Sequence, residues 1–293
     1  MRFGMHLSFK GGPERAEALG CKALQIFCGN PRGWQKSPLD PAFVSEFRAQ
    51  VAQADLVPLV VHATYLINLA APDENIYRLS RDSFIFEMQC AAQLGAQFYV
   101  AHSGNHRGAG PDEGRRRVAA CVQAALEAVP DGPDILMENT AGSGSALGAT
   151  FEEIAALMTV VNTPRLALCL DTCHAWAAGY NIRTPEGVKN MLDTIEQTVG
   201  LQRLRCLHLS DAKGGLGSRL DRHEHIGKGC IGDAGFRALF SDQRLWQLPV
   251  ILETPRDRPD DERNDLQCAI NLAIACGAPP GNNENAAHIA VFP

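Results

Sequence analysis

The chain has 293 residues, of which 45% are hydrophobic and 20% are charged, and its formal net charge at pH 7 is −6. These values are ordinary for a soluble globular enzyme, and the length suits one large domain of the α/β-barrel kind. The negative net charge argues against a nucleic-acid-binding protein, whose affinity normally depends on a basic surface. A function on nucleic acid would therefore need a local positive site.

Targeting signals and cysteines point to an intracellular protein. The N-terminal segment MRFGMHLSFKGG has no apolar core long enough for a signal peptide. No stretch approaches the ~18 apolar residues that a membrane helix needs. The ten cysteines include no CxxC pair, and most lie in apolar segments, as expected for reduced thiols. We therefore predict a soluble, cytoplasmic protein that makes no contact with a membrane and has no disulfide framework.

Eight short apolar runs are separated by segments of helical spacing. The runs cover residues 3–6, 23–27, 57–62, 98–102, 134–138, 166–171, 204–208 and 249–253. Each is rich in Val, Ile, Leu or Phe, as expected for strands that are buried on both faces. Apolar stripes at helical spacing follow the second and third runs: Phe43, Val44, Phe47 and Val51, then Ile76, Leu79, Phe84 and Met88. Thr150 and Glu153 predict a capping box at the start of the helix that follows the fifth run.

Repeated strand–helix units predict a parallel sheet with right-handed crossovers, and eight such units close into a (β/α)8 TIM barrel. A doubly wound open sheet is the alternative. The barrel is expected to span residues 1–277, with the active site at the carboxyl ends of the strands. Residues 278–293 are rich in Pro, Gly and Asn, and we expect them to form a flexible tail outside the barrel.

The last six of the eight runs end on residues that can bind a metal: His62, His102, Glu138, Asp171, His208 and Glu253. The carboxyl ends of barrel strands meet on one face, so these side chains should gather around one point. A single His or Asp after a strand is usually a loop cap. Six in succession, all imidazole or carboxylate, predict a metal site. The absence of thiolates favours catalytic over structural zinc, and manganese or iron would also suit this set.

Three further candidate ligands come from loops. His174 lies three residues after Asp171, one turn past the sixth strand. Asp221 and His223 alternate along an extended segment, so their side chains share one side. Together His174, Asp221 and His223 would form a three-ligand site with open positions, the arrangement of catalytic metals. We interpret the neighbouring Cys173 as a packing residue and not as a nucleophile.

Long contiguous stretches of the chain resemble the endonuclease IV family of zinc-dependent abasic-site endonucleases. They are HATYLINLA at residues 62–70, AHSGNH at 101–106, ENTAGSGSALG at 138–148, CLDTCHAWAAGYNIRTPE at 169–186, HLSDAK at 208–213, GSRLDRHEHIGKGCIG at 217–232 and ILET at 251–254. The resemblance covers residues 1 to about 277 and includes all nine candidate ligands.

The resemblance implies a trinuclear zinc centre in a deep pocket. The candidate ligands divide into three groups: His62, His102 and Glu138 for the first ion; Glu138 again, as a bridge, with Asp171, His208 and Glu253 for the second; and His174, Asp221 and His223 for the third. Manganese would also be accepted at some of these sites. Glu138 and Glu253 are the implied catalytic residues, Glu138 as the bridge and Glu253 as a group that orients or deprotonates the attacking water.

The implied reaction cuts double-stranded DNA on the 5′ side of an abasic site and leaves a 3′-hydroxyl and a 5′-deoxyribose phosphate, with related activity on blocked 3′ ends. A recessed site requires the nucleotide to be flipped out of the duplex. The family pattern assigns the filling of the gap to Arg32, Tyr65 and Leu66. Candidate contacts to the DNA backbone are Lys213, Arg219, Arg222 and Lys228. We expect the protein to act as a monomer.

Two other functions fit parts of the sequence. A metal-dependent sugar isomerase or epimerase would share the barrel but would need only one or two metals, so the trio of His174, Asp221 and His223 argues against it. A non-catalytic damage-binding protein would not need open coordination positions on several metals. Bound zinc would also supply the positive site that this acidic chain otherwise lacks.

Overall fold

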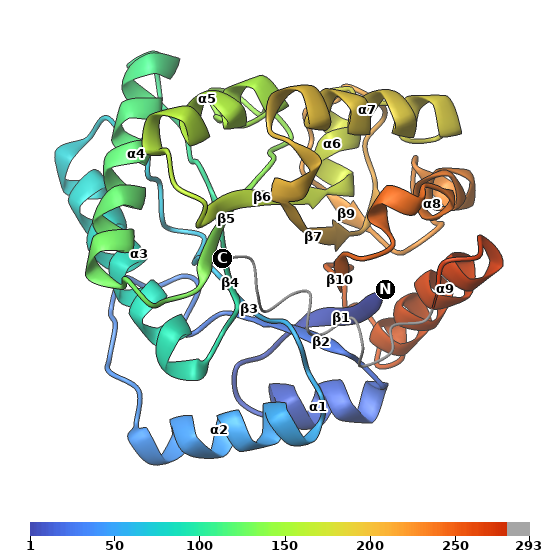
Figure 1. The fold of residues 1–293 in the computed structure, drawn as a ribbon, viewed down its shortest axis with the longest axis horizontal. Helices are drawn as coiled ribbons and strands as arrows, with labels where there is room; N and C mark the ends of the chain where they lie inside the picture. Colours follow the sequence, from blue (N-terminus) through green and yellow to red (C-terminus); the bar gives the residue numbers. More distant parts are fainter. Residues whose placement is uncertain (280–293) are drawn as a thin grey trace.

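Eight parallel strands form a closed barrel in the computed structural model, which describes residues 1–279 (Figure 1). Around the barrel the strands follow the order β1-β10-β7-β6-β5-β4-β3-β2. Their bounds are β1 (Arg2–Leu7), β2 (Ala23–Ile26), β3 (Leu59–His62), β4 (Phe98–His102), β5 (Asp134–Glu138), β6 (Leu166–Asp171), β7 (Leu204–Leu209) and β10 (Pro249–Leu252). All eight predicted strands are therefore confirmed, and the closed barrel excludes the open sheet.

Helices surround the barrel, as the view along its axis in Figure 1 shows. They are α1 (Gly12–Leu19), α2 (Pro41–Gln53), α3 (Glu74–Leu94), α4 (Pro111–Ala128), α5 (Phe151–Val161), α6 (Thr172–Ala178), α7 (Pro185–Thr198), α8 (Gly232–Ser241) and α9 (Asp261–Ala275), with 3-10 turns η1 (Leu201–Arg203) and η2 (Gln243–Leu245). The predicted apolar stripes face the barrel through Phe47, Phe84 and Met88, which are buried. Within residues 1–279, none of these helices is both long and apolar enough to span a membrane.

The predicted capping box of α5 forms only in part. The Thr150 side chain accepts a hydrogen bond from the backbone N–H of Glu153 at 3.3 Å, as an N-cap does. The Glu153 carboxylate, however, accepts from the N–H groups of Gly148 and Ala149 at 2.9 and 3.0 Å and not from that of Thr150. Glu153 therefore fixes the end of the loop that follows β5 as well as the start of the helix.

The inside of the barrel holds an apolar cluster, separate from the core between strands and helices: Ala23, Val60, Phe98, Val100, Leu136, Ala167, Cys169, Cys206 and Ile251. Side chains alternate between the two faces of a strand, so the second residue after an inward-facing one also faces inward. On each strand of this cluster the next inward residue toward the carboxyl end is polar: Gln25, His62, His102, Glu138, Asp171, His208 and Glu253. The period of two thus gives the apolar barrel a polar upper layer.

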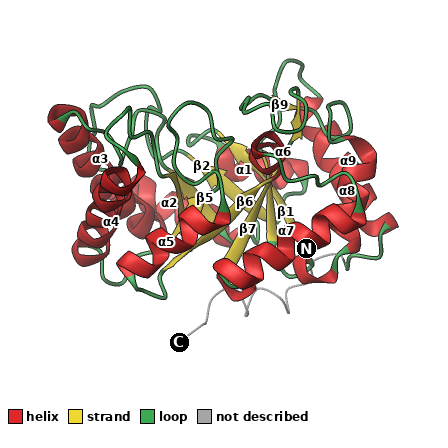
Figure 2. Ribbon diagram, turned by 90° about the horizontal axis from the view of Figure 1, so that it is seen from above, coloured by secondary structure: helices red, strands yellow, loops and turns green. Residues whose placement is uncertain are grey.

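A short hairpin follows β7 and adds to this layer. It pairs β8 (Asp211–Ala212) with β9 (His223–Glu224) in antiparallel fashion. Figure 2 shows β9 and α6 together at one end of the barrel, away from the end where the N-terminus lies. The connection between β8 and β9 contains Asp221, and β9 begins at His223, so the hairpin delivers two of the predicted loop ligands to the carboxyl ends of the strands.

The burial of the cysteines and the position of the two chain ends can be compared with the sequence analysis. All ten cysteines are free, and seven of them are buried, whereas Cys230, Cys268 and Cys276 are only half-buried. Ala278 is buried, and the Pro279 carbonyl accepts a hydrogen bond from the N-terminal amine of Met1 at 2.7 Å. From residue 280 on, the predicted tail lies outside the described residues.

Closure of the barrel between β1 and β2 depends on a residue without a side chain. Gly4 pairs with Ala23, and a Cβ added at Gly4 would lie 2.0 Å from the Ala23 carbonyl oxygen. Gly4→Ala should therefore lower the free energy of unfolding by about 1–3 kcal/mol or more, because the two strands must move apart. Urea unfolding measures this loss.

Gly12→Ala is the matched control, because a Cβ there would meet its nearest neighbour, Ile26, at an ordinary 3.7 Å. Its stability should stay within about 0.5 kcal/mol of the parent. Equal losses in the two variants would contradict the role assigned to Gly4.

Candidate metal centre

Glu138, at the end of β5, is fully buried and faces four imidazoles. Its Oε2 lies 3.1 Å from Nε2 of His62 and 3.4 Å from Nε2 of His102. Its Oε1 lies 3.3 Å from Nδ1 of His174 and 3.1 Å from Nδ1 of His208. These histidines come from β3, β4, α6 and β7, so four elements far apart in the sequence meet at one carboxylate.

A second group surrounds Asp171, at the end of β6. The ligating atoms of Glu138, Asp171, His208 and Glu253 all lie within 4.8 Å of one another. Asp171 is fully buried and accepts a hydrogen bond from the backbone N–H of His174 at 2.6 Å through Oδ1, whereas its Oδ2 has no hydrogen-bond partner. Burial raises the pKa of Asp171. A buried carboxylate oxygen without a partner is costly, and a cation would satisfy it.

The third group forms where the β8–β9 hairpin meets α6. Asp221 Oδ1 lies 3.3 Å from Nε2 of His174 and 3.3 Å from Nε2 of His223. Although burial acts in the opposite direction, hydrogen bonds from these two imidazoles hold the pKa of Asp221 well below its usual range. Burial likewise opposes protonation of His223, but the hydrogen bond with Asp221 raises its pKa to about 9. All nine predicted ligands thus lie in one continuous cluster.

Hydrogen bonds to the main chain fix the orientation of three of these imidazoles. Each donates from Nδ1 to a carbonyl oxygen: His62 to Ala63 (2.7 Å), His174 to Asn139 (2.9 Å) and His223 to Glu253 (2.8 Å). A carbonyl can only accept, so Nδ1 carries a proton in each ring; Nε2 then donates to a carboxylate when the ring is protonated, and presents a lone pair to a cation when the ring is neutral. Metal-binding histidines are typically held in this way.

Two polar residues of the same layer, Gln25 and His6, were missed by the sequence analysis. Gln25 is fully buried; its Oε1 accepts from His208 Nε2 at 2.8 Å, and its Nε2 donates to Glu253 Oε1 at 2.5 Å. His6 Nδ1 lies 3.0 Å from the same Glu253 oxygen, and its buried Nε2 has no partner. The signal was present, because the first predicted strand ends on His6 just as the later strands end on ligands.

The donor set fits divalent cations. Nitrogen lone pairs and carboxylate oxygens face one another at hydrogen-bond distance, and such groups repel unless a proton or a cation lies between them. Burial opposes a charge on His208, yet Glu253 and Glu138 raise its pKa to about 10. Against its own burial, the imidazoles of His208 and His102 hold the pKa of Glu138 well below its usual range. Imidazole and carboxylate donors suit zinc, manganese or iron.

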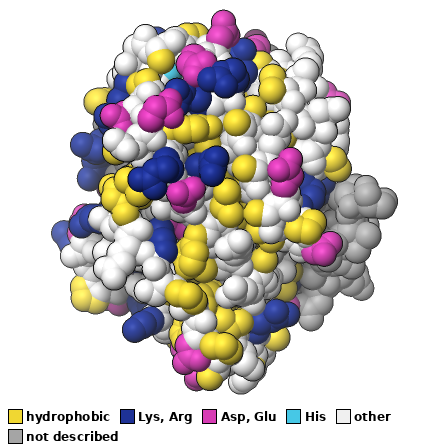
Figure 3. Space-filling model, turned by 90° about the vertical axis from the view of Figure 1, so that its left-hand side faces the viewer, with side chains coloured by type: hydrophobic (Ala, Val, Ile, Leu, Met, Phe, Trp, Pro, Cys, Tyr) yellow, Lys and Arg dark blue, Asp and Glu magenta, His cyan; other side chains and the backbone are white. Residues whose placement is uncertain are grey.

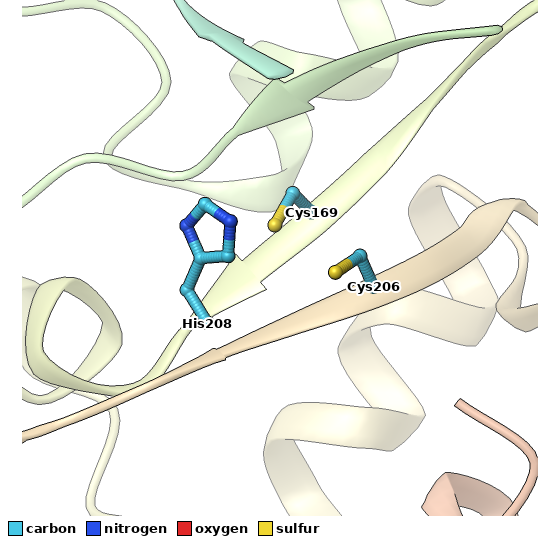
Figure 4. A group of neighbouring side chains, drawn as sticks. All are labelled: Cys169, Cys206 and His208. Atoms are coloured by element: carbon cyan, nitrogen blue, oxygen red, sulfur yellow. The ribbon is translucent and has the colours of Figure 1, made fainter. Parts of the chain in front are cut away.

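Thiols lie beside this layer without joining it. Figure 4 shows Cys169 and Cys206, on adjacent strands, next to His208, and the three ligating atoms lie within 4.8 Å of one another. Burial raises the pKa of Cys169 well above its usual range, and that of Cys173 to about 12. Cys169 and Cys206 belong to the apolar cluster inside the barrel, and Cys173 is buried near Asp221 and His223, so its interpretation as a packing residue stays a prediction.

A cavity of about 740 Å³ opens above the cluster. His62, His102, His174, His223 and Glu253 line it, with Asp221 at its side. Tyr65 stands on its rim with 66% of its surface exposed, and its ring contacts that of Phe27 at 5.0 Å between centroids. The cavity is large enough for a nucleotide and leads directly to the candidate ligands.

Of the predicted DNA contacts, the structure places Tyr65 and Arg222 at the cavity. The remaining five lie outside its lining: Arg32, Lys213, Arg219 and Lys228, which are at least partly exposed, and Leu66, which is half-buried. Arg256 also lines the cavity and was not predicted, because it follows the last strand in a charged loop with no motif. On the side of the molecule seen in Figure 3, basic and acidic side chains are interspersed and form no continuous basic surface.

Asp211 anchors the hairpin loop that carries the third group. Its carboxylate is fully buried and accepts hydrogen bonds from four backbone N–H groups: Ala212 (2.8 Å) and Ile231 (2.8 Å) at Oδ1, and Gly229 (2.9 Å) and Gly232 (3.0 Å) at Oδ2. These bonds close the loop of residues 212–229 into a fixed shape. Asp211 lies in the HLSDAK stretch and its other donors lie within residues 229–232, so the carboxylate connects the two ends of the loop.

Comparisons with known proteins agree on one relationship. The family model described as xylose isomerase-like TIM barrel matches residues 13–273. A Chloroflexus aurantiacus protein named "Probable endonuclease 4" is 43% identical over 271 residues, covering 90% of this chain and 95% of that protein. A Methanoculleus marisnigri protein of the same name is 43% identical over 278 residues, covering 93% and 99%.

Solved structures give the same result. Endonuclease IV from Thermus thermophilus is similar with a TM-score of 0.84 and 39% identity, covering 94% of this chain and 100% of that one. A D-tagatose 3-epimerase-like protein has a TM-score of 0.73 at 19% identity, covering 95% and 100%. At that identity, the second similarity extends to the fold alone.

Asp211→Asn should loosen the hairpin loop, because the new amide presents N–H groups to backbone N–H donors. We expect a loss of about 1–3 kcal/mol in the stability of this region, seen as faster amide hydrogen exchange over residues 213–230. Asp242→Asn is the control, since Asn caps η2 as well as Asp242 does. Parent-like exchange in Asp211→Asn would remove the anchoring role.

Proposed function

The chain belongs to the xylose isomerase-like TIM barrel family and, within it, to the endonuclease IV group, and on this premise we propose that it hydrolyses the phosphodiester 5′ to abasic sites in double-stranded DNA. Membership makes it a metal-binding DNA repair nuclease. The observation that supports the finer proposal is the cluster itself, in which Glu138 joins four imidazoles and Asp221 joins two.

We assign three zinc ions to this cluster. The proposed ligands are His62, His102 and Glu138 for the first ion; Glu138, Asp171, His208 and Glu253 for the second; and His174, Asp221 and His223 for the third. The unpartnered Asp171 oxygen and the fixed imidazoles support this assignment. Manganese is the proposed substitute at some sites, because it accepts the same nitrogen and oxygen donors.

The chain's own groups prepare the reaction. When bound, zinc supplies Lewis acidity toward the phosphodiester and makes water acidic enough to ionise near neutral pH. Glu253, held by Gln25 and His6, orients the attacking water and accepts its proton. The water oxygen joins phosphorus while the bond from phosphorus to the 3′ oxygen breaks, and the departing 3′ oxygen takes up a proton from solvent. The products carry a 3′-hydroxyl and a 5′-deoxyribose phosphate, and the same chemistry would clean blocked 3′ ends.

The recessed position of the cluster explains the choice of damaged DNA. A phosphate in straight duplex would not reach the floor of the cavity, so the nucleotide must leave the stack, which is easiest where no base holds it. We propose that Arg32, Tyr65 and Leu66 fill the gap and that Lys213, Arg219, Arg222 and Lys228 contact the backbone. Zinc would give the cavity a positive potential despite the acidic exterior. A monomer suffices, since one chain supplies every proposed ligand.

A sugar isomerase or epimerase would use the same barrel, but it would need only one or two metal ions. It would therefore not need the group of His174, Asp221 and His223 as metal ligands. Damage binding without catalysis would likewise leave the open coordination positions unused. Neither alternative accounts for a cluster of this size.

Metal analysis and one substitution test the metal assignment. The purified protein should contain three zinc ions per chain, and Glu138→Gln should lower that content and reduce cutting of a duplex with an abasic-site analogue by more than about a thousandfold. Glu152→Gln, which changes an exposed carboxylate on α5, is the control and should retain full activity. Fewer than three ions in the parent would favour the isomerase, and full activity of Glu138→Gln would refute the metal scheme.

Damage recognition is tested at the rim. Tyr65→Ala should weaken binding to abasic duplex by about 1–3 kcal/mol, the usual range for a stacking aromatic. Zinc content should stay the same, because Tyr65 is not among the candidate ligands. Fluorescence anisotropy with abasic and undamaged duplexes measures the difference. Val160→Ala, an exposed apolar side chain on α5, should bind like the parent. Unchanged affinity of Tyr65→Ala would remove this residue from the interface.

A further inference from the structure

Glu87, on α3, is a buried carboxylate that lies outside the metal cluster. It is fully buried, and it does not line the cavity. Its Oε2 accepts from the Thr64 backbone N–H at 3.0 Å and from the Tyr99 hydroxyl at 3.2 Å. Its Oε1 accepts from the Thr64 hydroxyl at 2.7 Å and from the Lys36 ammonium. Every partner of this carboxylate comes from a different part of the barrel wall.

Two of these partners, Lys36 and Thr64, belong to the two loops that carry the proposed gap-filling residues. Lys36 lies between β2 and α2, on the loop that contains Arg32. Thr64 lies between β3 and α3, directly before Tyr65. Lys36 also donates to the Thr64 hydroxyl at 3.4 Å. The two loops are therefore joined to each other beneath the surface, and both are held to α3 and β4 through Glu87 and Tyr99.

A buried ion pair is a poor way to gain stability, because removing both charges from water costs about as much as their attraction returns. It is an effective way to fix geometry, since Glu87 is satisfied only when both loops are in place. At the surface the same loops meet through the rings of Phe27 and Tyr65, which lie edge to face with 5.0 Å between centroids. The buried pair thus adds a charged, hydrogen-bonded link between the two loops beneath this surface contact.

We propose that Glu87 and Lys36 are positioning residues for damage recognition: they hold the Arg32 loop and the Tyr65 loop at the separation needed to fill the gap left by a flipped abasic nucleotide. This inference rests on the proposed function. Glu87 and Lys36 touch neither the candidate ligands nor the cavity, so they act through the loops alone.

Glu87→Gln and Lys36→Met test the proposal, because both keep the shape of the side chain and remove its charge. Each should raise Kd for abasic duplex, and KM with it, by about three- to thirtyfold, while kcat stays within about twofold and zinc content is unchanged. The fluorescence of a 2-aminopurine base placed opposite the abasic site should change less on binding than with the parent, because the side chains of the two loops enter the gap less fully. The double variant should cost less than the sum of the two single losses, because both remove one shared interaction.

Asp55→Asn is the matched control. Arg2, buried near the amino ends of the strands, lies 3.0 Å from Asp55 and donates to the carbonyls of Lys22 and Val57. Breaking this pair should lower Tm as Glu87→Gln does and leave Kd and KM unchanged. Asn also tolerates the left-handed backbone of Asp55, at φ 53°. All binding is compared at a temperature well below every Tm.

Parent-like Kd, KM and 2-aminopurine signals in Glu87→Gln and Lys36→Met, with only Tm lowered, would overturn the proposal. If Glu87→Gln does not fold, Lys36→Met decides alone, because its side chain comes from a loop and reaches partial exposure of 13%. A parent protein that fails to prefer abasic over undamaged duplex would instead defeat the proposed function. A parent that discriminates, with variants that discriminate equally, defeats this inference only.

Discussion

The site depends on one electrostatic constraint: Glu138 is a carboxylate removed from water and surrounded by four imidazoles. A buried anion must be compensated, and neutral rings that offer lone pairs cannot do this alone. Cations placed among these groups satisfy the carboxylates and the nitrogens at once. The need for positive charge is therefore built into the carboxyl end of the barrel, and the same need gives an acidic protein a place for a phosphodiester.

Geometry for this constraint comes from the regularity of the barrel. Because inward side chains recur every second residue, an apolar interior layer and a polar upper layer can follow one another on the same strands. Leu136 and Glu138 illustrate the change, as do Cys169 and Asp171. The apolar layer below supports the charged one. The three candidate ligands that do not lie on barrel strands come from α6, which carries His174, and from the β8–β9 hairpin, which carries Asp221 and His223.

Hydrogen bonds outside the sheet hold the imidazole rings and the loops around the site. Main-chain carbonyls orient three imidazoles, and Asp211 closes the hairpin loop with four backbone hydrogen bonds. Glu87 performs the corresponding task for the two loops at the rim. In each case an acceptor is satisfied by groups from a particular arrangement of its surroundings, which restricts the loop that supplies them.

The sequence by itself determined the eight strands, the barrel and the six strand-end residues, because strand periodicity and the convergence of parallel strands are local rules. It also indicated His174, Asp221 and His223 through their spacing. It did not reveal Gln25, His6, Arg256 or Glu87, and it placed Glu153 in a closed capping box that forms only in part. Those roles depend on which groups meet across the barrel wall. Only the tertiary structure decided them, since a hydrogen bond between residues distant in the chain leaves no periodic trace in the sequence.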